Sequence, residues 1–306
     1  MSAPILDTSS ERVPVPLVPA AEDAAPVVAM RWETFRRLVR NRAAFVGLVI
    51  VVSFVATALL ADVLAPYDPY VGDLAERLRP PSPAHWLGTD ALGRDMLTRL
   101  MFGARTSLQI QLATIGIALF AGTTWGLVSG YFGGWVDDIS MRLIDVLLAF
   151  PGILLAITIV AILGAGFSNI ILAIGIASLP GLARLVRGIV LGLRELEYIE
   201  AARAIGESHL SIMWRYILPG TIAPLTVATS LRMASVLLSA SGLSFLGLGV
   251  LPPTPEWGAM LSDARDYMFS SPHATTIPGI AITLVVVGFN LLGDGLRDAL
   301  DPKMRV

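Results

Sequence analysis

Residues 43–63 read AAFVGLVIVVSFVATALLADV, a nearly unbroken apolar run. A helix of about twenty such residues spans the roughly 30 Å hydrocarbon core of a bilayer. Apolar runs of similar length recur along the rest of the chain, at residues 107–130, 141–164, 168–190, 221–248 and 278–296. The sequence therefore predicts an all-α integral membrane protein with six transmembrane helices.

The composition points the same way. Of the 306 residues, 55% are hydrophobic and 15% are charged, and the mean hydropathy is +0.71. A water-soluble domain cannot bury that much apolar surface, so lipid must solvate much of the chain. A net charge of -2 argues against a nucleic-acid partner. The sequence has no cysteine and three scattered histidines, which argues against a metal site.

The N-terminal segment is polar and rich in Pro, Ala and Val, which predicts a disordered tail over residues 1–30. Residues 31–42 read RWETFRRLVRNR and suit an amphipathic helix at the membrane surface, with Trp32 and Phe35 inserted. The five arginines of this segment precede the first span and favour a cytoplasmic N-terminus. Six spans then place both termini in the cytoplasm.

This topology divides the chain into four expected segments. They are a cytoplasmic tail at 1–30, an amphipathic helix with the first span and an external region at 31–106, a five-helix core at 107–298, and a cytoplasmic C-terminus at 299–306. Within the core, the topology places residues 191–220 in the cytoplasm and residues 250–277 outside. Several arginines lie in or just before the first of these loops, and acidic residues outnumber arginine in the second, as the charge rule predicts. The agreement is imperfect, because the first external region also carries arginines, interspersed with acids in a long loop.

The cytoplasmic loop carries a specific pattern. It contains Glu200-Ala201-Ala202, then Gly206 six positions after Glu200, and finally Leu218-Pro219. Acids favour a helix start, and Gly206 can adopt the positive φ that ends one. Ser208 can cap a second helix with the apolar stripe Leu210, Met213 and Ile217, which Leu218-Pro219 is expected to end. An ordinary amphipathic connector would also produce much of this pattern.

The spacing resembles the EAA loop of the integral-membrane subunits of ABC importers. Other motifs are similar to those of dipeptide and oligopeptide permeases: HWLGTD (85–90), LGRD (92–95), GARTSL (103–108), GYFGG (130–134), PPTPEWG (252–258) and NLLGDGLRD (290–298). The resemblance runs from about residue 31 to the end. It is strongest to the second, C-type permease of these systems, which includes the glutathione importers.

The resemblance implies a type I ABC importer permease fold. In that family the EAA loop docks on the ATPase, so the implied coupling residues are Glu200, Ala201, Ala202, Gly206, Leu218 and Pro219. The implied partners are a homologous second permease, two cytoplasmic subunits that bind ATP and Mg, an external substrate-binding protein, a peptide substrate and membrane lipid. No catalytic residue or cofactor is expected in this chain, which would lie in a prokaryotic inner (plasma) membrane.

Charges within the spans are the other candidates for function. Arg232 lies about a dozen residues into the fifth expected span, where an arginine is costly and should face a bundle interior or a wet cavity. Asp145 lies just inside the third. Both are candidates for the translocation path. Alternatively, Arg232 forms a structural pair with Asp145, with Asp294 or with an acid of a partner permease.

Three other functions are alternatives: a secondary transporter, an intramembrane enzyme and a nickel importer. A secondary transporter predicts internal repeats and charged pairs deep in several spans, whereas Arg232 is the one clearly deep charge in this sequence. An intramembrane enzyme needs a constellation such as HExxH or GxSxG, and the sequence has neither. A nickel importer would share most of these motifs. The sequence has no GxxxxGK[ST] loop, so ATP must be used by another chain.

Overall fold

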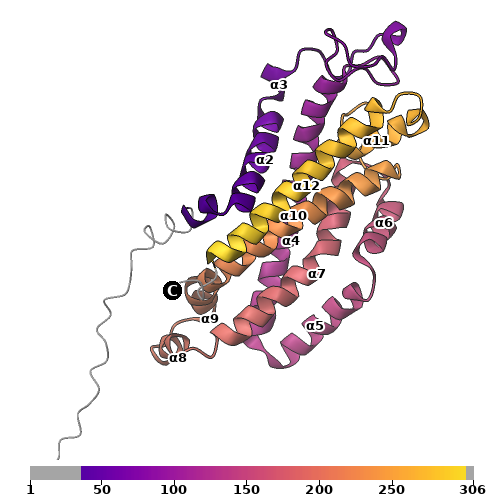
Figure 1. Cartoon of the computed structure of the whole chain (residues 1–306). Coiled ribbons are helices and arrows are strands. Elements are labelled where there is room, and N and C mark those ends of the chain that lie inside the picture. The colour runs from indigo at the N-terminus through magenta and orange to yellow at the C-terminus, as the bar shows by residue number, and fades with distance from the viewer. Residues whose placement is uncertain (1–35, 301–306) are drawn as a thin grey trace, which may run out of the picture.

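A computed structural model of the chain describes residues 36–300, which form a bundle of long helices (Figure 1). Within that range there is no β-strand, and an isolated bridge joins Thr89 to Asp95. Five of the helices are long and apolar enough to cross a membrane: α2 (Arg42–Leu59), α4 (Met96–Phe132), α7 (Phe167–Leu193), α10 (Leu218–Phe245) and α12 (His273–Leu300).

The sixth crossing is broken. The expected span at 141–164 is instead two helices, α5 (Gly134–Leu148) and α6 (Gly152–Leu163), which are bent by 86° from one another. The break lies at Pro151, which has no N–H to donate and disfavours helical φ/ψ at Phe150 before it. The all-α membrane fold with six apolar segments is confirmed, but the third segment is not one continuous helix.

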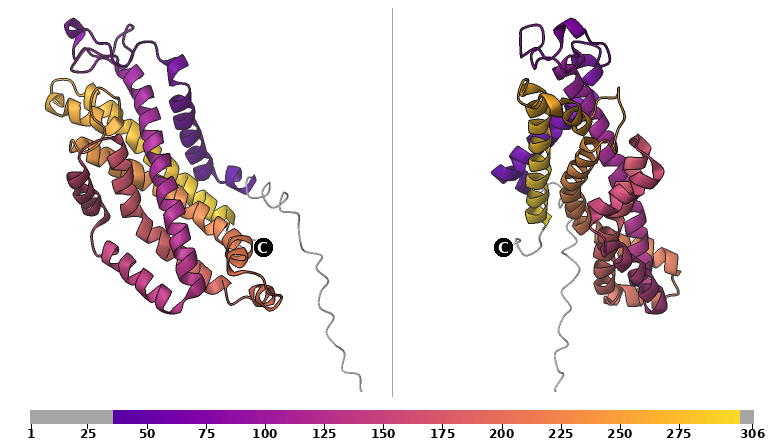
Figure 2. Two further views of the ribbon diagram at one scale, coloured as in Figure 1. Left: turned by 180° about the vertical axis from the view of Figure 1, so that it is seen from behind. Right: turned by 90° about the vertical axis from the view of Figure 1, so that its right-hand side faces the viewer.

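Shorter elements lie at the two ends of the bundle. At one end, the loop end, are α3 (Ala61–Leu64), η1 (Leu74–Glu76), α11 (Trp257–Ala264) and η3 (Arg265–Tyr267). At the other, the hairpin end, are α8 (Glu197–Ala204), α9 (His209–Ser211) and η2 (Ile212–Ile217). Figure 2 shows this separation from two further sides. The short helix α11 was not expected in the 250–277 loop, although the Glu256 side chain caps it in the usual way by accepting from Gly258 N and Ala259 N.

The second span begins earlier than its apolar run. A span from residue 107 was expected, and the structure begins this helix earlier, at Met96, in α4, which is 37 residues or about 55 Å long. Residues 90–94 form a turn before it, because Asp90 Oδ1 accepts hydrogen bonds from Leu92 N and Arg94 N, each at 2.9 Å. Asp95 then caps the helix by accepting from Thr98 N at 2.7 Å.

The two chain ends are described in part. Residues 36–40 are helical, and Leu38 is buried beneath α12 near Gly295. Asn41 ends this segment and caps α2, since its Oδ1 accepts from Ala43 N and Ala44 N. This agrees with the expected amphipathic helix, although Trp32, Phe35 and the tail at 1–30 lie outside the described residues, as do residues 301–306.

His85 holds the loop end together by bridging two carboxylates. Its Nδ1 lies 2.9 Å from Asp95 Oδ1 and its Nε2 lies 3.0 Å from Glu76 Oε2. A protonated imidazole donates from both nitrogens, so it satisfies both acids at once. The hydrogen bond to Asp95 raises the pKa of His85 most, burial opposes the rise, and the bond to Glu76 adds to it.

Because the pKa of His85 is raised in the folded state, the stability of the loop end should depend on pH. Because the folded pKa lies above the unfolded value, its contribution is complete below about pH 6.5 and is lost as the pH rises through the raised value. We expect amide exchange in residues 76–95, corrected for intrinsic rates, to accelerate as the pH rises above about 6.5. His85→Gln should remove this dependence, and His209→Gln at the hairpin end should retain it. An unchanged dependence in His85→Gln would contradict the assignment.

Candidate functional site

The hairpin at residues 196–217 begins with α8, whose end has a defined geometry. Glu197 and Glu200 occupy the first turn, where negative charge suits the helix dipole. Gly206 follows the helix with φ +83°. Glu207 N donates to Ala202 O at 3.1 Å and Gly206 N to Arg203 O at 3.0 Å, which is the Schellman pattern. The predicted role of Gly206 as a helix terminator is therefore confirmed.

The second half of the hairpin differs from the expectation in one respect. Ser208 caps α9 as predicted, accepting from Ser211 N at 3.2 Å. However, Leu218-Pro219 does not stop the helix, because α9, η2 and α10 run on as one helix over His209–Phe245. The π turn of η2 explains the continuity, since Leu218 N bonds to Met213 O, five residues back. That wider turn accommodates Pro219, which cannot donate and whose ring needs space.

One face of the hairpin is buried and the other is exposed. Ile199 and Ala202 pack with Ile212, Met213 and Ile217 in an apolar cluster that includes Leu127, Tyr131 and Val190 of α4 and α7. Of the predicted stripe, Leu210 is 63% exposed, and Ile212 takes its place in the interior. The reason is the π turn, which sets residues five apart, such as Ile212 and Ile217, on one face.

The predicted coupling residues are therefore divided between the two faces. Ala202 is buried beneath the hairpin, whereas Glu200, Ala201 and Gly206 are exposed at its surface. Leu218 and Pro219 lie where the hairpin becomes α10. The exposed face also carries Ile205 (76% exposed) and Leu210, large apolar side chains that a partner could cover.

Tyr131 supports the hairpin from below, and the sequence analysis did not identify it as a site residue. Its hydroxyl lies 2.8 Å from His209 Nδ1, and the Arg203 guanidinium lies 5.5 Å from its ring centroid. Nearby, Arg194 Nη1 donates to Gly130 O at 2.9 Å. The signal was present in the GYFGG motif, whose aromatic residues stand between glycines at the end of a span. These contacts join α4 to both halves of the hairpin.

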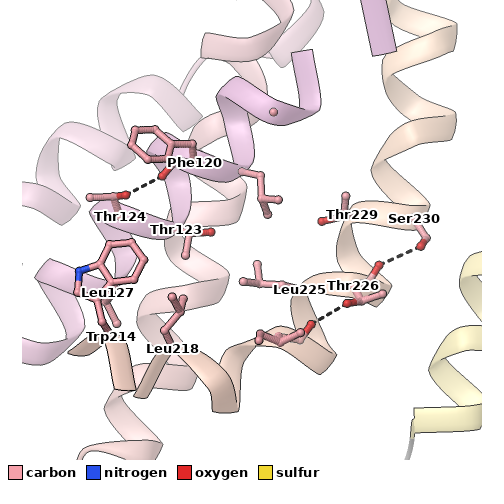
Figure 3. A pocket seen from close by; sticks show the side chains of 13 residues that line it. Phe120, Thr123, Thr124, Leu127, Trp214, Leu218, Leu225, Thr226, Thr229 and Ser230 are labelled. Atoms are coloured by element: carbon pink, nitrogen blue, oxygen red, sulfur yellow. Dashed lines mark hydrogen bonds between the residues drawn. The ribbon is translucent and has the colours of Figure 1, made fainter. Parts of the chain in front are cut away.

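A cavity of about 550 Å³ opens between α4 and α10 beside the hairpin (Figure 3). It is mainly apolar, with Trp214, Leu218 and Leu225 among its lining residues, but it also carries five hydroxyl side chains. Three of these bond to the carbonyl four residues back in their own helix: Thr124, Thr226 and Ser230. The hydroxyl oxygens of the other two, Thr123 and Thr229, are buried and have no hydrogen-bond partner among the described residues, and the two side chains face one another across the space.

Arg232 lies near the middle of α10, on the helix face that carries Leu225 and Thr229, seven and three positions earlier. Its Nη1 donates one long hydrogen bond, at 3.4 Å, to Ser178 O of α7. Gly181 leaves room for the guanidinium of Arg232, because a Cβ at position 181 would clash with it. Within residues 36–300 no carboxylate lies within ion-pair distance of Arg232.

The expected structural pairs of Arg232 within this chain are therefore wrong. Asp145 pairs with Arg184 of α7, and both side chains are more than half exposed. Asp294 is exposed on α12 and makes no ion pair within the described part of the chain. Residues 36–300 also bring together no group of three His, Asp or Glu side chains suited to a metal ion.

Comparisons with known proteins agree on one class. Residues 122–306 match the family described as the binding-protein-dependent transport system inner membrane component, and residues 30–81 match the N-terminal TM domain of oligopeptide transport permease C. The chain is 47% identical over 292 residues to the dipeptide transport system permease protein DppC of Alkalihalophilus pseudofirmus, covering 95% of this chain and 96% of that protein. It is 49% identical over 276 residues to the glutathione transport system permease protein GsiD of Pectobacterium atrosepticum, covering 90% and 92%.

The fold has a solved counterpart. An inward-facing structure of the MetNI methionine ABC transporter superposes with a TM-score of 0.55 at 17% sequence identity, covering 67% of this chain and 98% of that one. At that identity the match concerns the arrangement of helices alone.

Proposed function

This chain belongs to the family of binding-protein-dependent transport system inner membrane components, the permease subunits of ABC importers, and from that premise we propose that its substrate is a short peptide. Relatives named for dipeptide and for glutathione transport, at 47% and 49% identity, support this substrate class. Because glutathione is itself a tripeptide, both names favour a peptide over the nickel alternative. Membership in this family also removes the secondary-transporter alternative.

The protein functions within an ABC transporter complex, and its orientation and detailed partners are part of the proposal. The hairpin end lies in the cytoplasm and the loop end outside, in a prokaryotic inner membrane. Arg203 and Arg215 of the hairpin, with Arg184, Arg187 and Arg194 just before it, support this orientation. The start of α2 and the end of α12, which lie near the two ends of the described residues, are directed toward the hairpin end (Figure 1), which agrees with cytoplasmic termini.

The hairpin docks on one of two cytoplasmic ATP-binding subunits, which hold ATP and Mg. Its exposed residues Glu200 and Ala201 contact that subunit, while Ala202 anchors the hairpin to the bundle. The observation that carries this role is the continuous helix from His209 to Phe245. It joins the hairpin to one wall of the cavity between α4 and α10, which we call the α4–α10 groove. A displacement of the hairpin by the ATPase would therefore reach α10 directly, and Leu218 and Pro219 are the link rather than a stop.

The groove between α4 and α10 is this subunit's half of the translocation path, completed by a homologous second permease. Apolar walls with a few hydroxyls bind cargo weakly, which suits a conduit that must release what it carries. An external substrate-binding protein delivers the peptide. Arg232 lies one turn beyond Thr229 and provides a cation for a peptide carboxylate. Asp145, already paired with Arg184, is the weaker of the two path residues first considered.

Reconstitution tests the function. The chain, its partner permease and the ATP-binding subunits should import a dipeptide into proteoliposomes when ATP and the delivery protein are supplied. Omitting the ATP-binding subunits should stop uptake. Uptake that persists without any nucleotide-hydrolysing subunit would contradict the proposal.

Replacing Arg232 tests the path. Arg232→Met removes the cation but keeps an unbranched side chain, and dipeptide uptake should fall about tenfold through loss of a charge-assisted hydrogen bond. The same change at the exposed Arg142 of α5 should leave uptake unchanged. If Arg232→Met instead prevents assembly with the second permease, the residue pairs with an acid of that partner. Full uptake with normal assembly would exclude both roles.

A further inference from the structure

A second cavity, of about 340 Å³, lies at the loop end. The turn at residues 90–94 and the first turn of α4 form one side, and Pro252, Pro253 and α11 form the other. It is separate in sequence from the α4–α10 groove, whose lining begins at Gly116. Its size falls in the range of sites for small molecules, which is roughly 300–1,000 Å³.

Two arginines line this cavity and are buried, with Arg94 6% exposed and Arg99 3% exposed. Both lie against one carboxylate: Asp90 Oδ2 is 2.7 Å from Arg94 Nε and 3.3 Å from Arg99 Nε. Arg99 Nη1 also donates to Pro69 O at 2.9 Å and to Pro253 O at 3.4 Å. The carboxylate of Asp263, in the same lining, also lies close enough to attract both guanidinium groups, so the cluster contains two cations and two anions.

Arg94 retains unused hydrogen-bond donors. Its Nε donates to Asp90, but its two Nη groups donate to no atom in the described part of the chain. A guanidinium presents donors in a planar fork that matches a carboxylate, and it binds one through two parallel hydrogen bonds. These free donors favour a carboxylate in the cavity.

The rim of the cavity has the opposite character. Asp263 of α11 lines it, is exposed, and forms no ion pair within residues 36–300. The neighbouring Asp266, in contrast, has Arg265 within 3.5 Å. Met260 adds an apolar side chain to the lining. The cavity therefore combines the free guanidinium donors of Arg94 with a carboxylate, that of Asp263, which forms no ion pair of 4 Å or less within residues 36–300.

We propose that this loop-end cavity binds a small zwitterion, an amino acid or dipeptide, with its carboxylate on Arg94 and its ammonium on Asp263. A simple anion would leave Asp263 unused, and a simple cation would be repelled by Arg94 and Arg99. The inference rests on the proposed function, because that function places the loop end outside, where delivered peptide is present. The cavity would be a first holding site, distinct from the groove between α4 and α10.

The assembled complex in lipid nanodiscs, without its delivery protein, provides the test. Equilibrium dialysis would measure binding of labelled Ala-Ala, its C-terminal amide and its N-acetyl form. We expect saturable binding of Ala-Ala and at least about tenfold weaker binding of each blocked form, since each lacks one charge-assisted contact. In Asp263→Asn, free and N-acetylated peptide should bind equally, while the amide should still bind more weakly.

Asp68→Asn is the matched control, because Asp68 is exposed at the same end of the bundle but outside the cavity, and asparagine preserves its hydrogen bond with Tyr70 N. It should retain the full discrimination. Absence of saturable Ala-Ala binding, or equal discrimination in Asp263→Asn and the parent complex, would overturn the proposal. So would an Asp263→Asn complex that loses affinity for the delivery protein while peptide binding is unchanged.

The uptake assay separates this failure from failure of the proposed function. If ATP-driven dipeptide uptake is normal and the cavity binds no zwitterion, the holding site alone is refuted. If the parent complex shows no ATP-driven dipeptide uptake with its delivery protein, the proposed substrate class itself is refuted.

Discussion

Replacing Gly206 by valine is expected to reduce dipeptide uptake and transport-linked ATP hydrolysis to about a tenth or less, while the chain still inserts and folds. Gly206 has φ +83°, a conformation that costs an L-residue about 1–2 kcal/mol, which corresponds to about tenfold or more in the population of the hairpin. For a β-branched side chain such as valine, the conformational free energy is at least this unfavourable. No atom lies within 4 Å of a Cβ at this position, so the cost arises from the backbone rather than from a clash.

Two variants separate this backbone effect from the added side chain. Gly206→Asn should retain most of the coupling, because asparagine tolerates the left-handed region. Gly188→Val makes the same chemical change within α7, where a Cβ also meets nothing within 4 Å and φ is helical. It should leave hydrolysis and uptake coupled. The measurements are stimulated ATPase rate and co-purification of the ATP-binding subunits, and normal values in Gly206→Val would exclude the docking role of the hairpin.

Local chemistry predicted the parts of the fold that depend on neighbours in sequence. The apolar runs identified every spanning segment, because bilayer thickness fixes the length of a helix that crosses it. The Gly206 terminator and the Ser208 cap followed from groups within a few residues. Pro151 breaks its helix but Pro180 lies inside the continuous α7, so proline alone did not decide where helices end.

Features that depend on tertiary packing could not be predicted from the sequence. The π turn before Pro219 keeps the helix continuous and buries Ile212 and Ile217 beneath it, and no local pattern distinguishes that outcome from a helix stop. The ion-pair partners could not be predicted from the sequence either, since Asp145 pairs with Arg184 rather than with Arg232. The loop-end cavity is lined by both Arg94 and Asp263, which are far apart along the chain.

The functional residues divide in the same way. Arg232 could be found from sequence because a charge in mid-span is rare and costly. Thr123 and Thr229 could not, because hydroxyl side chains on spanning helices usually bond to their own backbone, as Thr124 and Thr226 do. Only the tertiary structure distinguishes the satisfied hydroxyls from the unsatisfied ones.

Replacing Gly126 by alanine is expected to destabilise the bundle by about 1–3 kcal/mol, the usual cost of overpacking. Small residues let membrane helices approach closely, and Gly126 lies where α4 meets α7. A Cβ there would collide with Ala183 O and would lie 2.8 Å from Val186 Cβ and 2.9 Å from Arg187 N. Because two of these atoms are backbone, no side-chain rotation relieves the clash, and the helices must separate.

Gly116→Ala is the matched control on the same helix, since a Cβ there meets nothing within 4 Å. Alanine is favoured over glycine inside a helix by roughly 0.5–1 kcal/mol, so this variant should be neutral or slightly more stable. The unfolding temperature of the purified chain in detergent should therefore fall for Gly126→Ala. For Gly116→Ala it should rise slightly or stay unchanged. Equal shifts would mean that the α4–α7 contact does not limit stability. If Gly126→Ala is folded but inactive, it would show instead that close approach of these helices is needed for transport.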